Sequence, residues 1–413
     1  MRILVGWNDV AQGDLIQLIL SAGDHDVVLC TNWEEFEAEV TGSDAWDIIL
    51  LAIGDGPGDE SPATDSEVDS AGDDANYRRF CNVRNRLPGI PIVGACSGDN
   101  VYRIARYMTN GMRMYLIRDT GGDFIFMMQS ILESTVQSVR AEREQFVAEK
   151  LREEIESVRK LQESIIPQDL DCPDGFDISA RYESSQIRVM GGQPVTLAGG
   201  DYYDVFRLDD YSLVVLVGDA SGHGMKACMS IMTMHTLVSM IRTHAYEDTA
   251  GFVADVNRRL CEHSIVSGEG GFITLLYGIL RTDTNEFQWT SAGHPIPMLQ
   301  NLADGSVEPL GTLEDGGLPL GVVDDAEYDV HTSIIPPGSR LLVYTDGLEE
   351  AFPHGNRDHD QYGIEGIVRT MQTTRDQSTN AALQALFDES TAYTLGAGRH
   401  DDTSVVLVER SGV

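Results

Sequence analysis

The sequence carries very little positive charge. Lysine occurs only three times in 413 residues, and the 29 lysines and arginines together face 66 acidic residues, which leaves a net charge of −37. A surface of this sign repels nucleic acid and anionic membranes, so neither is expected as a partner. We interpret the excess as a solvated acidic surface, of a kind suited to a salt-rich cytoplasm whose ions screen self-repulsion.

Paired cysteines and long apolar runs are absent as well. The six cysteines are scattered without a CxxC pair, a pattern that supports neither a zinc site nor a disulfide framework and predicts free, mostly buried thiols. No apolar run approaches the roughly 20 residues needed to cross a bilayer. The first residues, MRILVGW, lead straight into a strand pattern without a positively charged leader. We therefore expect a soluble, cytoplasmic protein.

A chain of this length, with 42% hydrophobic residues, is too long for one core and predicts several domains. We place them at residues 1–120, 121–167 and 168–413. In the first, short apolar runs alternate with helix-compatible stretches, which predicts a doubly wound α/β sheet with strands at Arg2–Val5, Val27–Cys30, Trp46–Ile53, Ile90–Val93 and Met112–Ile117. The stretch Gly54–Tyr77 has eight acidic residues and no basic one, and is predicted to be a solvated or disordered loop.

The second unit is predicted to be one long helix over Phe124–Ile166, ended by Pro167. Apolar residues recur at heptad-like intervals in two runs, with Arg143 and Lys150 at core positions between them; the runs are Leu132, Val136, Val139 and Phe146, then Leu151, Ile155, Val158 and Ile165. This pattern favours a coiled-coil seam in a homodimer, and the alternative is a single long helix packed on its own domain.

The third unit alternates strands of period two with helices, which predicts an α+β sandwich. The expected strands are Ser212–Val217, Phe272–Leu280, Phe287–Ser291, Arg340–Tyr344 and Thr403–Val408, and the expected helices are Met225–Thr243, Thr249–Ser264 and Thr379–Thr394.

Aspartates recur in this unit where a strand meets a turn. Asp201 lies in GGDYYD, Asp219 in GDASGHG and Asp346 in TDGLEE, while Asp401 and Asp402 precede the strand TSVVLV. A carboxylate buried at a strand end loses hydration, but several converging carboxylates become favourable when they share hard cations. Neighbouring glycines allow the close approach that a small site needs.

In their order and spacing, these motifs resemble the PPM-type, metal-dependent serine/threonine phosphatases of the branch typified by SpoIIE and RsbU. The resemblance runs from Leu161 to Arg410 and includes LQESIIPQDL, GGDYYDVF, VLVGDASGHG, FITLLYGIL, SAGHPIPML, LPLGV, PPGSRLLVYTDGLEEA and RHDDTSVVLV. It implies an αββα sandwich of two antiparallel sheets with helices outside.

The resemblance also implies a site for two Mn²⁺ or Mg²⁺ ions. Asp219 would bridge both metals beside the carbonyl of Ala220, and Asp201 would orient water on the first. Asp346 and Asp401 would complete the second metal site. Asp402, adjacent to Asp401, is an alternative for the same role.

The implied reaction is in-line attack on a phosphomonoester by a water held between two cations. Related eukaryotic enzymes carry a histidine two residues after the bridging aspartate. Ser221 stands there in this chain, and His223 is the nearest histidine, so the general acid is either His223 or a metal-bound water. His294, in AGHP, is expected chiefly to form a turn. The connection ESSQIRVMGGQPVTLA, before GGDYYD, is longer than usual and is either a hairpin over the cleft or a tolerated surface insertion.

Residues 1–120 resemble a response-regulator receiver domain whose phosphoacceptor aspartate is replaced by Ala52. Trp7, Asn8 and Asp9 stand where an acidic pair is expected, and the hydroxyl and lysine positions hold Cys96 and Arg118. Asp55 is a poor substitute, three residues further on. These departures predict a pseudo-receiver that signals by binding a partner or by dimerising.

The whole chain is thus predicted to be a protein phosphatase regulated by its N-terminal domain through the helix, which would move the Asp219 turn. By resemblance, the substrate would be a phosphoserine or phosphothreonine on a STAS-type anti-sigma-factor antagonist, and an upstream signalling protein would bind the N-terminal domain. Two alternatives are a pseudophosphatase adaptor that binds a partner without catalysis, and a hydrolase of small phosphomonoesters.

Overall fold

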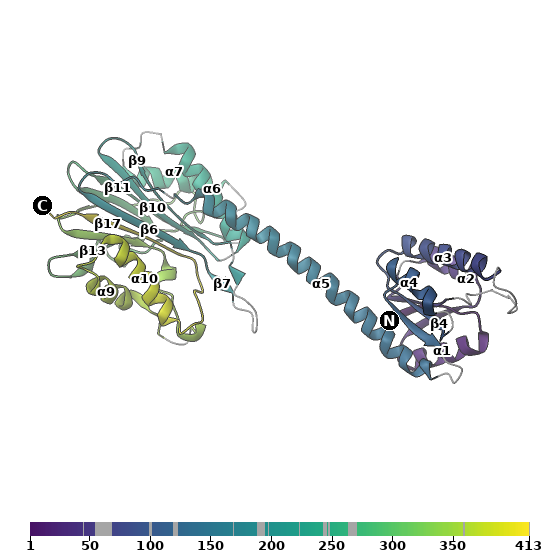
Figure 1. Ribbon diagram of the computed structural model, residues 1–413. Coiled ribbons are helices and arrows are strands. Elements are labelled where there is room, and N and C mark those ends of the chain that lie inside the picture. The colour runs from purple at the N-terminus through teal and green to yellow at the C-terminus, as the bar shows by residue number, and fades with distance from the viewer. Residues whose placement is uncertain are drawn as a thin grey trace. The chain divides into compact units, whose positions relative to one another are not determined.

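The computed structural model describes residues 1–43, 45–53, 68–98, 101–118, 123–167, 169–187, 195–196, 198–222, 224–242, 246, 248–262, 271–357 and 360–412. The chain divides into two compact units, Met1–Lys150 (unit 1) and Leu151–Val413 (unit 2). The division falls inside one helix, α5 (Phe124–Ile165), which contributes its two ends to different units (Figure 1).

Unit 1 is built on a five-stranded parallel sheet. The strands are β1 (Arg2–Gly6), β2 (Asp26–Cys30), β3 (Ile48–Ile53), β4 (Ile92–Ser97) and β5 (Met114–Arg118), in the order β2-β1-β3-β4-β5. This is the flavodoxin-like order of doubly wound folds. The connecting helices are α1 (Val10–Ala22), α2 (Trp33–Gly42), α3 (Val68–Arg86) and α4 (Val101–Thr109).

The two faces of this sheet have separate hydrophobic cores. Alternate strand residues point to opposite faces, so Ile3 and Val5 pack with α1 and the start of α5, whereas Leu4 packs with α2, α3 and α4. All six residues of β3 are buried, as expected for a central parallel strand covered on both sides.

The loop predicted over Gly54–Tyr77 is wrong in its second part. Helix α3 begins at Val68 and continues to Arg86. Its later turns are held in the core by Phe80 and Val83, three residues apart on one helix face, with Tyr77 packed against them. The acidic composition of the segment concealed this helical period. Residues 54–67, including Asp55, lie outside the described residues.

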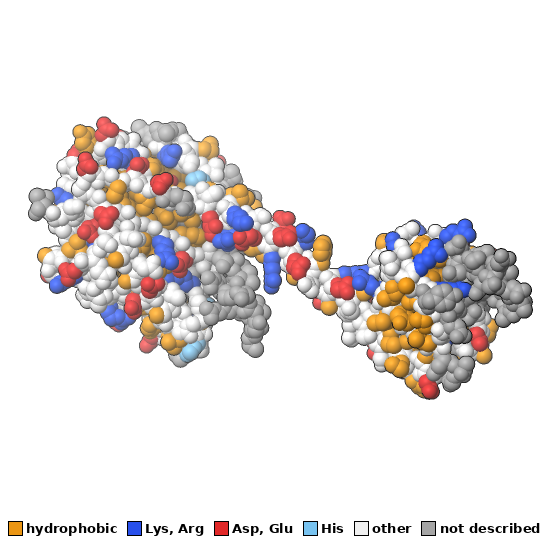
Figure 2. Space-filling model, viewed as in Figure 1, with side chains coloured by type: hydrophobic (Ala, Val, Ile, Leu, Met, Phe, Trp, Pro, Cys, Tyr) orange, Lys and Arg blue, Asp and Glu red, His pale blue; other side chains and the backbone are white. Residues whose placement is uncertain are grey.

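Helix α5 matches the predicted long helix, but its first apolar run is used within its own unit. Leu132 and Val136 lie in the core of unit 1 and Val139 is also buried, as in the alternative of a helix packed on its own domain. Residues 141–154 are exposed around the whole helix, and they include Phe146 and Leu151 of the predicted seam. Charged side chains of both signs are visible along this stretch (Figure 2).

Unit 2 contains two five-stranded antiparallel sheets. One has the order β15-β12-β11-β10-β9 and the other β14-β13-β16-β17-β6. The first comprises β9 (Asp201–Arg207), β10 (Ser212–Ala220), β11 (Ile273–Arg281), β12 (Glu286–Ala292) and β15 (His331–Ile334). The second comprises β6 (Phe176–Glu183), β13 (Met298–Asn301), β14 (Val307–Pro309), β16 (Ser339–Tyr344) and β17 (Thr403–Arg410). Two further strands, β7 (Gln186–Ile187) and β8 (Val195–Thr196), pair as a small hairpin within the long connection before GGDYYD.

Helices cover the outer faces of both sheets. α6 (Met225–Ile241) and α7 (Thr249–Cys261) lie on the first sheet, and α9 (Gly363–Thr373) and α10 (Thr379–Tyr393) lie over the second (Figure 1). Leu341 and Val343 point from β16 into the large core shared with the first sheet, while Leu342 and Tyr344 point toward α9 and α10. The layers are therefore helix, sheet, sheet, helix. α9 is a helix that sequence analysis did not predict.

All six cysteines are free thiols, and Cys172 is the exposed one. Among the described residues, no helix combines the length and apolar character needed to cross a bilayer.

Candidate functional site

The first two predicted aspartates are direct neighbours on adjacent strands. Asp201 begins β9 and Asp219 lies one residue before the end of β10, and the two are paired across the antiparallel ladder. Residues opposite one another on such a ladder have Cβ atoms about 5 Å apart. Asp201 is only 1% exposed, so a carboxylate there is almost completely removed from water.

The glycine before Asp201 makes this close approach possible. A Cβ at Gly200 would lie 2.8 Å from the carbonyl oxygen of Ala220 and 3.3 Å from Oδ1 of Asp219. The Ala220 amide donates to the Gly200 carbonyl at 2.9 Å, which extends the pairing of the two strands past the aspartates. A larger residue at position 200 would fill the space beside the carboxylates.

Burial and mutual repulsion raise the pKa of both carboxyl groups. The pKa of Asp201 lies well above its ordinary value, first because of burial and then because of the nearby Asp402 charge. The pKa of Asp219 is likewise well above its ordinary value through burial and through repulsion by Asp201, Asp346 and Asp401. Asp201 and Asp219 also share a hydrogen bond. Burial and repulsion therefore favour the protonated form of both carboxyl groups more than in a free aspartate.

The other two aspartates reach the cluster from the second sheet. Asp346 follows β16 and begins a short 3-10 helix, and Asp401 lies two residues before β17. Burial, followed by repulsion from Glu350, raises the pKa of Asp346 to about 6. Burial, followed by repulsion from Asp346, raises the pKa of Asp401 to about 7. Four carboxyl groups from both sheets thus act on one another electrostatically.

Thr345 links the two sheets beneath the cluster. Its hydroxyl donates to Oδ2 of Asp201 at 2.7 Å and accepts from the Ser404 amide at 2.8 Å. Thr345 is fully buried, so the bond to Asp201 is shielded from water.

The adjacent carboxylates Asp401 and Asp402 occupy different environments. Asp402 is 1% exposed, and its two oxygens accept from the amides of Ser185 at 2.7 Å and Gly200 at 2.6 Å. Asp401 is partly exposed, and the charges that raise its pKa are those of Asp346, Asp402 and Glu350. Asp402 thus orders the backbone around the site, whereas Asp401 faces the other carboxylates.

The donor set fits a hard divalent cation by its chemistry. Carboxylate oxygens are the ligands that Mg²⁺ and Mn²⁺ prefer, and a cation would relieve the repulsion that raises these pKa values. In the part of the chain that the structure describes, no three His, Cys, Asp or Glu side chains are grouped closely enough to hold a metal as they stand.

Two histidines considered from the sequence have different outcomes. His223 lies outside the described residues. His294 is 3% exposed, and burial lowers its pKa to about 3, so its ring is neutral. It follows the left-handed Gly293, and its backbone amide donates to the hydroxyl of Ser291 at 3.0 Å. Its Nδ1 is 3.0 Å from the hydroxyl of Thr274, the residue paired with Asp219. His294 therefore forms the predicted turn and lies behind the site.

Sequence reasoning assigned no role to two polar residues that adjoin the cluster. Glu350, in TDGLEE, raises the pKa of both Asp346 and Asp401 and pairs with Arg357 at 3.5 Å. Gln162, in LQESIIP, is fully buried and bonds to the backbone of Asp201. The motifs were recognised, but only the fold shows that these side chains reach the aspartates.

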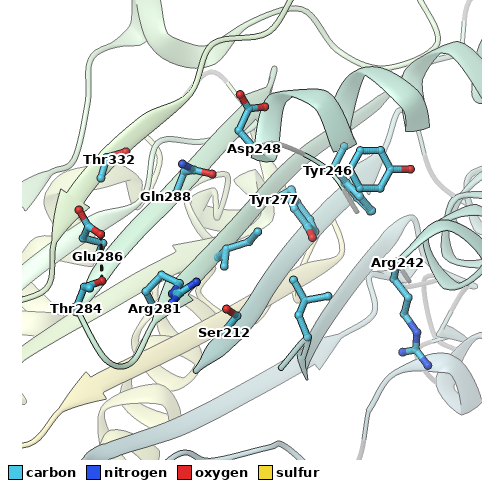
Figure 3. A pocket seen from close by; sticks show the side chains of 13 residues that line it. Ser212, Arg242, Tyr246, Asp248, Tyr277, Arg281, Thr284, Glu286, Gln288 and Thr332 are labelled. Carbon is cyan, nitrogen blue, oxygen red and sulfur yellow. Dashed lines mark hydrogen bonds between the residues drawn. The ribbon is translucent and has the colours of Figure 1, made fainter. Parts of the chain in front are cut away.

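A cavity of about 470 Å³ in unit 2 is separate from the aspartates (Figure 3). It lies beside Ser212, the first residue of β10, seven residues before Asp219 and so about 23 Å away at 3.3 Å per strand residue. Polar and aromatic side chains line it, among them Arg242, Tyr246, Tyr277, Arg281 and Gln288. Its position excludes it as the pocket that would hold a substrate on the aspartate cluster.

Comparisons with known proteins agree with this geometry. Residues 209–411, just under half of the chain, match the family described as stage II sporulation protein E (SpoIIE). Phosphoserine phosphatase RsbU of Bacillus subtilis is 26% identical over 206 residues, which cover 49% of this chain and 56% of RsbU. Phosphoserine phosphatase RsbP of the same organism is 23% identical over 200 residues, 48% of this chain and 45% of RsbP.

A third relative matches more of the chain. Protein IcfG of Synechocystis is 24% identical over 341 residues, 76% of this chain and 49% of IcfG. The chain thus spans about half the length of the curated relatives it matches. Among solved structures, the SiaA-PP2C domain of Pseudomonas aeruginosa superposes with a TM-score of 0.52 at 15% identity, covering 64% of this chain and 98% of that domain. This likeness shows a PP2C fold.

Proposed function

We propose that unit 2, which matches the SpoIIE family over residues 209–411, is a PPM-type phosphatase that hydrolyses phosphoserine or phosphothreonine on a partner protein. The observation that carries the proposal is the convergence of Asp201, Asp219, Asp346 and Asp401 from two sheets, each with a raised pKa. Such an arrangement costs stability unless it binds positive charge, and is typical of a functional site.

Two divalent cations, Mn²⁺ or Mg²⁺, would be held by the four aspartates, with the carbonyl of Ala220 beside Asp219. When bound, they would supply the positive charge that lowers the pKa of an attacking water and neutralises the phosphoryl oxygens. Asp402 supports the site through the backbone, since both of its oxygens already accept amide hydrogens. This favours Asp401 over Asp402 as the ligand.

The chain's own residues orient and protect this site. The Thr345 hydroxyl fixes one oxygen of Asp201, so its other oxygen is left to face the cluster. The Asp401 carboxyl, with a pKa of about 7, can hold a proton at neutral pH and release it when positive charge arrives. No nucleophilic Ser or Cys is required, and the buried Cys228, whose pKa burial raises to about 11, is unsuited to that role.

A protein substrate is favoured over the two alternatives. RsbU and RsbP are phosphoserine phosphatases, and the resemblance to them suggests a STAS-type anti-sigma-factor antagonist as the partner. A small phosphomonoester would need a basic pocket at the aspartates, but the cavity that carries Arg242 and Arg281 lies at the other end of β10. A pseudophosphatase adaptor would be free to lose ligands, yet all four aspartates remain.

For unit 1, we propose a receiver-like regulatory role without phosphorylation, through an upstream signalling protein. Ala52, in the phosphoacceptor position, is 2% exposed and part of the apolar core. Asp9 caps α1 by accepting from the Gln12 amide at 3.1 Å, so it is committed to the fold. We keep 1–120, 121–167 and 168–413 as functional segments, with the helical segment linking two cytoplasmic domains.

The exposed stretch of α5 is the proposed dimer seam. Phe146 is 61% exposed and Leu151 58% exposed, an unusual position for large apolar side chains on an otherwise charged helix. Replacing both by glutamate should shift the protein to the monomer in sedimentation velocity. The same change at the neighbouring exposed Arg152 should leave the oligomeric state unchanged, and a wild-type monomer would contradict the seam.

Hydrolysis of p-nitrophenyl phosphate and of a phosphoserine protein, with and without Mn²⁺, tests the proposed function. Wild type should turn over both substrates only with the metal. Asp219→Asn should lower turnover by a factor on the order of 10³, since it removes a charge that the reaction depends on. Metal-independent turnover, or full activity of Asp219→Asn, would overturn the proposal.

A further inference from the structure

We infer that Gln162, near the C-terminal end of α5, is a positioning residue that holds Asp201 in its metal-binding place. The inference deepens the proposed function of unit 2 and rests on it. Gln162 is fully buried, although most of α5 between residues 141 and 161 is exposed or half-buried. A buried amide is costly unless its hydrogen-bonding groups are satisfied, so its partners identify what it does.

Both ends of the Gln162 amide bond to the segment that leads into β9. Its Oε1 accepts from the Gly199 amide at 2.7 Å. Its Nε2 donates to the Asp201 carbonyl at 3.3 Å and to the Tyr182 hydroxyl at 3.2 Å. A side-chain amide has two donor hydrogens and an acceptor oxygen, and here each is used. One side chain of the helix therefore spans the Gly-Gly-Asp motif.

This motif is fixed from the opposite side by Asp402. Oδ2 of Asp402 accepts from the Gly200 amide at 2.6 Å, between the two backbone groups that Gln162 bonds. There is no spare room, because a Cβ at Gly199 would lie 2.1 Å from the Tyr182 hydroxyl and 2.6 Å from Cγ of Asp402. Since Asp201 is the first residue of β9, its place depends on these side-chain bonds as much as on the strand ladder.

The geometry makes the metal site sensitive to the helix. A one-residue shift along an α-helix moves a side chain by about 1.5 Å and turns it by about 100°, enough to break bonds of this length. The contact joins α5 to the backbone of Asp201, whereas the regulation predicted from the sequence acts on the Asp219 turn. Gln162 would thus couple the position of α5 to the affinity of the cluster for its cation.

The test compares Gln162→Met with Gln145→Met in the full-length protein. Methionine is close to glutamine in length and favours helix, but it cannot make these hydrogen bonds. Gln145 lies on the same helix and is exposed, and its side chain donates to Glu149 of its own helix at 2.9 Å, so it is a matched control. Mn²⁺ binding is measured by calorimetry after chelation, at a temperature where circular dichroism shows each variant folded.

We expect Gln162→Met to weaken Mn²⁺ binding at least tenfold, with turnover restored by excess Mn²⁺, and Gln145→Met to stay within twofold of wild type. Recovery in excess metal separates misplacement of Asp201 from a general loss of fold. Hydrogen exchange provides a readout without metal, because the Gly199 amide should exchange at least tenfold faster in Gln162→Met.

Mn²⁺ affinity and Gly199 exchange within twofold of wild type in folded Gln162→Met would overturn the inference. If that variant does not fold, Gln162→Asn decides in the same way, since its amide is one methylene too short to span Gly199 and Asp201. A wild type that binds Mn²⁺ but hydrolyses no phosphoserine would contradict the proposed function alone, and the affinity and exchange comparisons would still test Gln162.

Discussion

The two units place opposite chemistry at their strand ends. In unit 1, Trp7 follows β1, and Ala52 and Cys96 are the second-to-last residues of β3 and β4, all three almost completely buried. In unit 2, the corresponding strand ends carry Asp219, Asp346 and Asp401, whose raised pKa values report mutual repulsion. The first set stabilises its unit by apolar burial, whereas the second stores repulsion that a cation can relieve.

The surroundings of the two sets of residues differ as well. In unit 1, Trp7 stacks on Phe124 at 6.2 Å, and the Arg118 guanidinium lies 5.3 Å from the Trp7 ring. These contacts fill the space beside Trp7 with aromatic and guanidinium groups. In unit 2, the glycines around the aspartates keep their surroundings open to close approach, as at Gly347, where a Cβ would lie 1.9 Å from the Asp402 carbonyl.

Ala52→Asp, which places a carboxylate at a buried strand position of unit 1, should have the largest effect on stability. A carboxylate at this apolar position loses hydration without gaining a partner, so we expect the free energy of unfolding of unit 1 to fall by about 3–5 kcal/mol. Urea denaturation measures the loss. Ala38→Asp, on the exposed face of α2, is the control and should cost less than about 1 kcal/mol. A stable Ala52→Asp protein that accepts phosphate on position 52 would contradict the account of unit 1.

Substitutions of Asp401 and Asp402 should have opposite effects on the stability of the metal-free protein. Asp402→Asn replaces an acceptor of two buried amide hydrogens, and we expect it to lower the free energy of unfolding by about 2–3 kcal/mol. Asp401→Asn removes a repelled charge and should leave the metal-free protein as stable as wild type or more so, while weakening Mn²⁺ binding. Thermal unfolding with and without Mn²⁺ distinguishes the two roles, and the reverse pattern would exchange the assignments.

The pH dependence of stability tests the repulsion itself. In the metal-free fold, the pKa values of Asp346 and Asp401 are raised to about 6 and about 7, above the unfolded value of about 3.9. Between these limits the folded state binds more protons, so this contribution is present below pH 4 and is lost as the pH rises to 7. Because both groups are partly exposed, we expect a change on the order of 2 kcal/mol.

The double variant Asp346→Asn/Asp401→Asn separates the pH-dependent stability contributed by these two carboxyls from that of the other acidic groups. Urea denaturation in a chelator at pH 4 to 7.5 should show a shallower fall in stability for this variant than for wild type. Parallel curves for the two proteins would show that these carboxyls do not repel one another in the fold.

His294 should give the smallest effect. Its ring is buried and neutral, with a pKa of about 3, and its Nδ1 lies within hydrogen-bonding distance of the Thr274 hydroxyl. His294→Gln should therefore cost about 1 kcal/mol of stability and keep the shape of the pH–rate profile. Loss of one limb of that profile would make His294 a proton donor or acceptor in the reaction.

The sequence was most informative where a period or a motif was strong. The predicted strands of both units and the helix over Phe124–Ile166 match the structure within a few residues, because apolar spacing decides where backbone is buried. The acidic composition of Val68–Tyr77 led to the prediction of a loop, but this segment is the first part of helix α3. Helix α9, which follows the left-handed Gly363, was not predicted.

The sequence predicted which aspartates form the candidate site, but not the role of each one. Motif order located the aspartates, but the difference between Asp401 and Asp402 depends on which carboxylate meets the amides of Ser185 and Gly200, more than 200 residues away. Gln162 likewise reads as one more polar residue of a polar helix until the fold brings it to Gly199. Contacts of this range are set by packing, and local sequence does not encode them.

The central claim is that the buried aspartates of unit 2 form a site for divalent cations. Calorimetric titration of the chelator-treated protein with Mn²⁺ at pH 7, repeated in buffers of different ionisation enthalpy, tests it most directly. The account predicts binding that releases protons, because carboxyls with raised pKa values must ionise to become ligands, and predicts that Asp219→Asn abolishes both the binding and the release. Absence of Mn²⁺ binding by the wild-type protein, or binding that Asp219→Asn leaves intact, would contradict it.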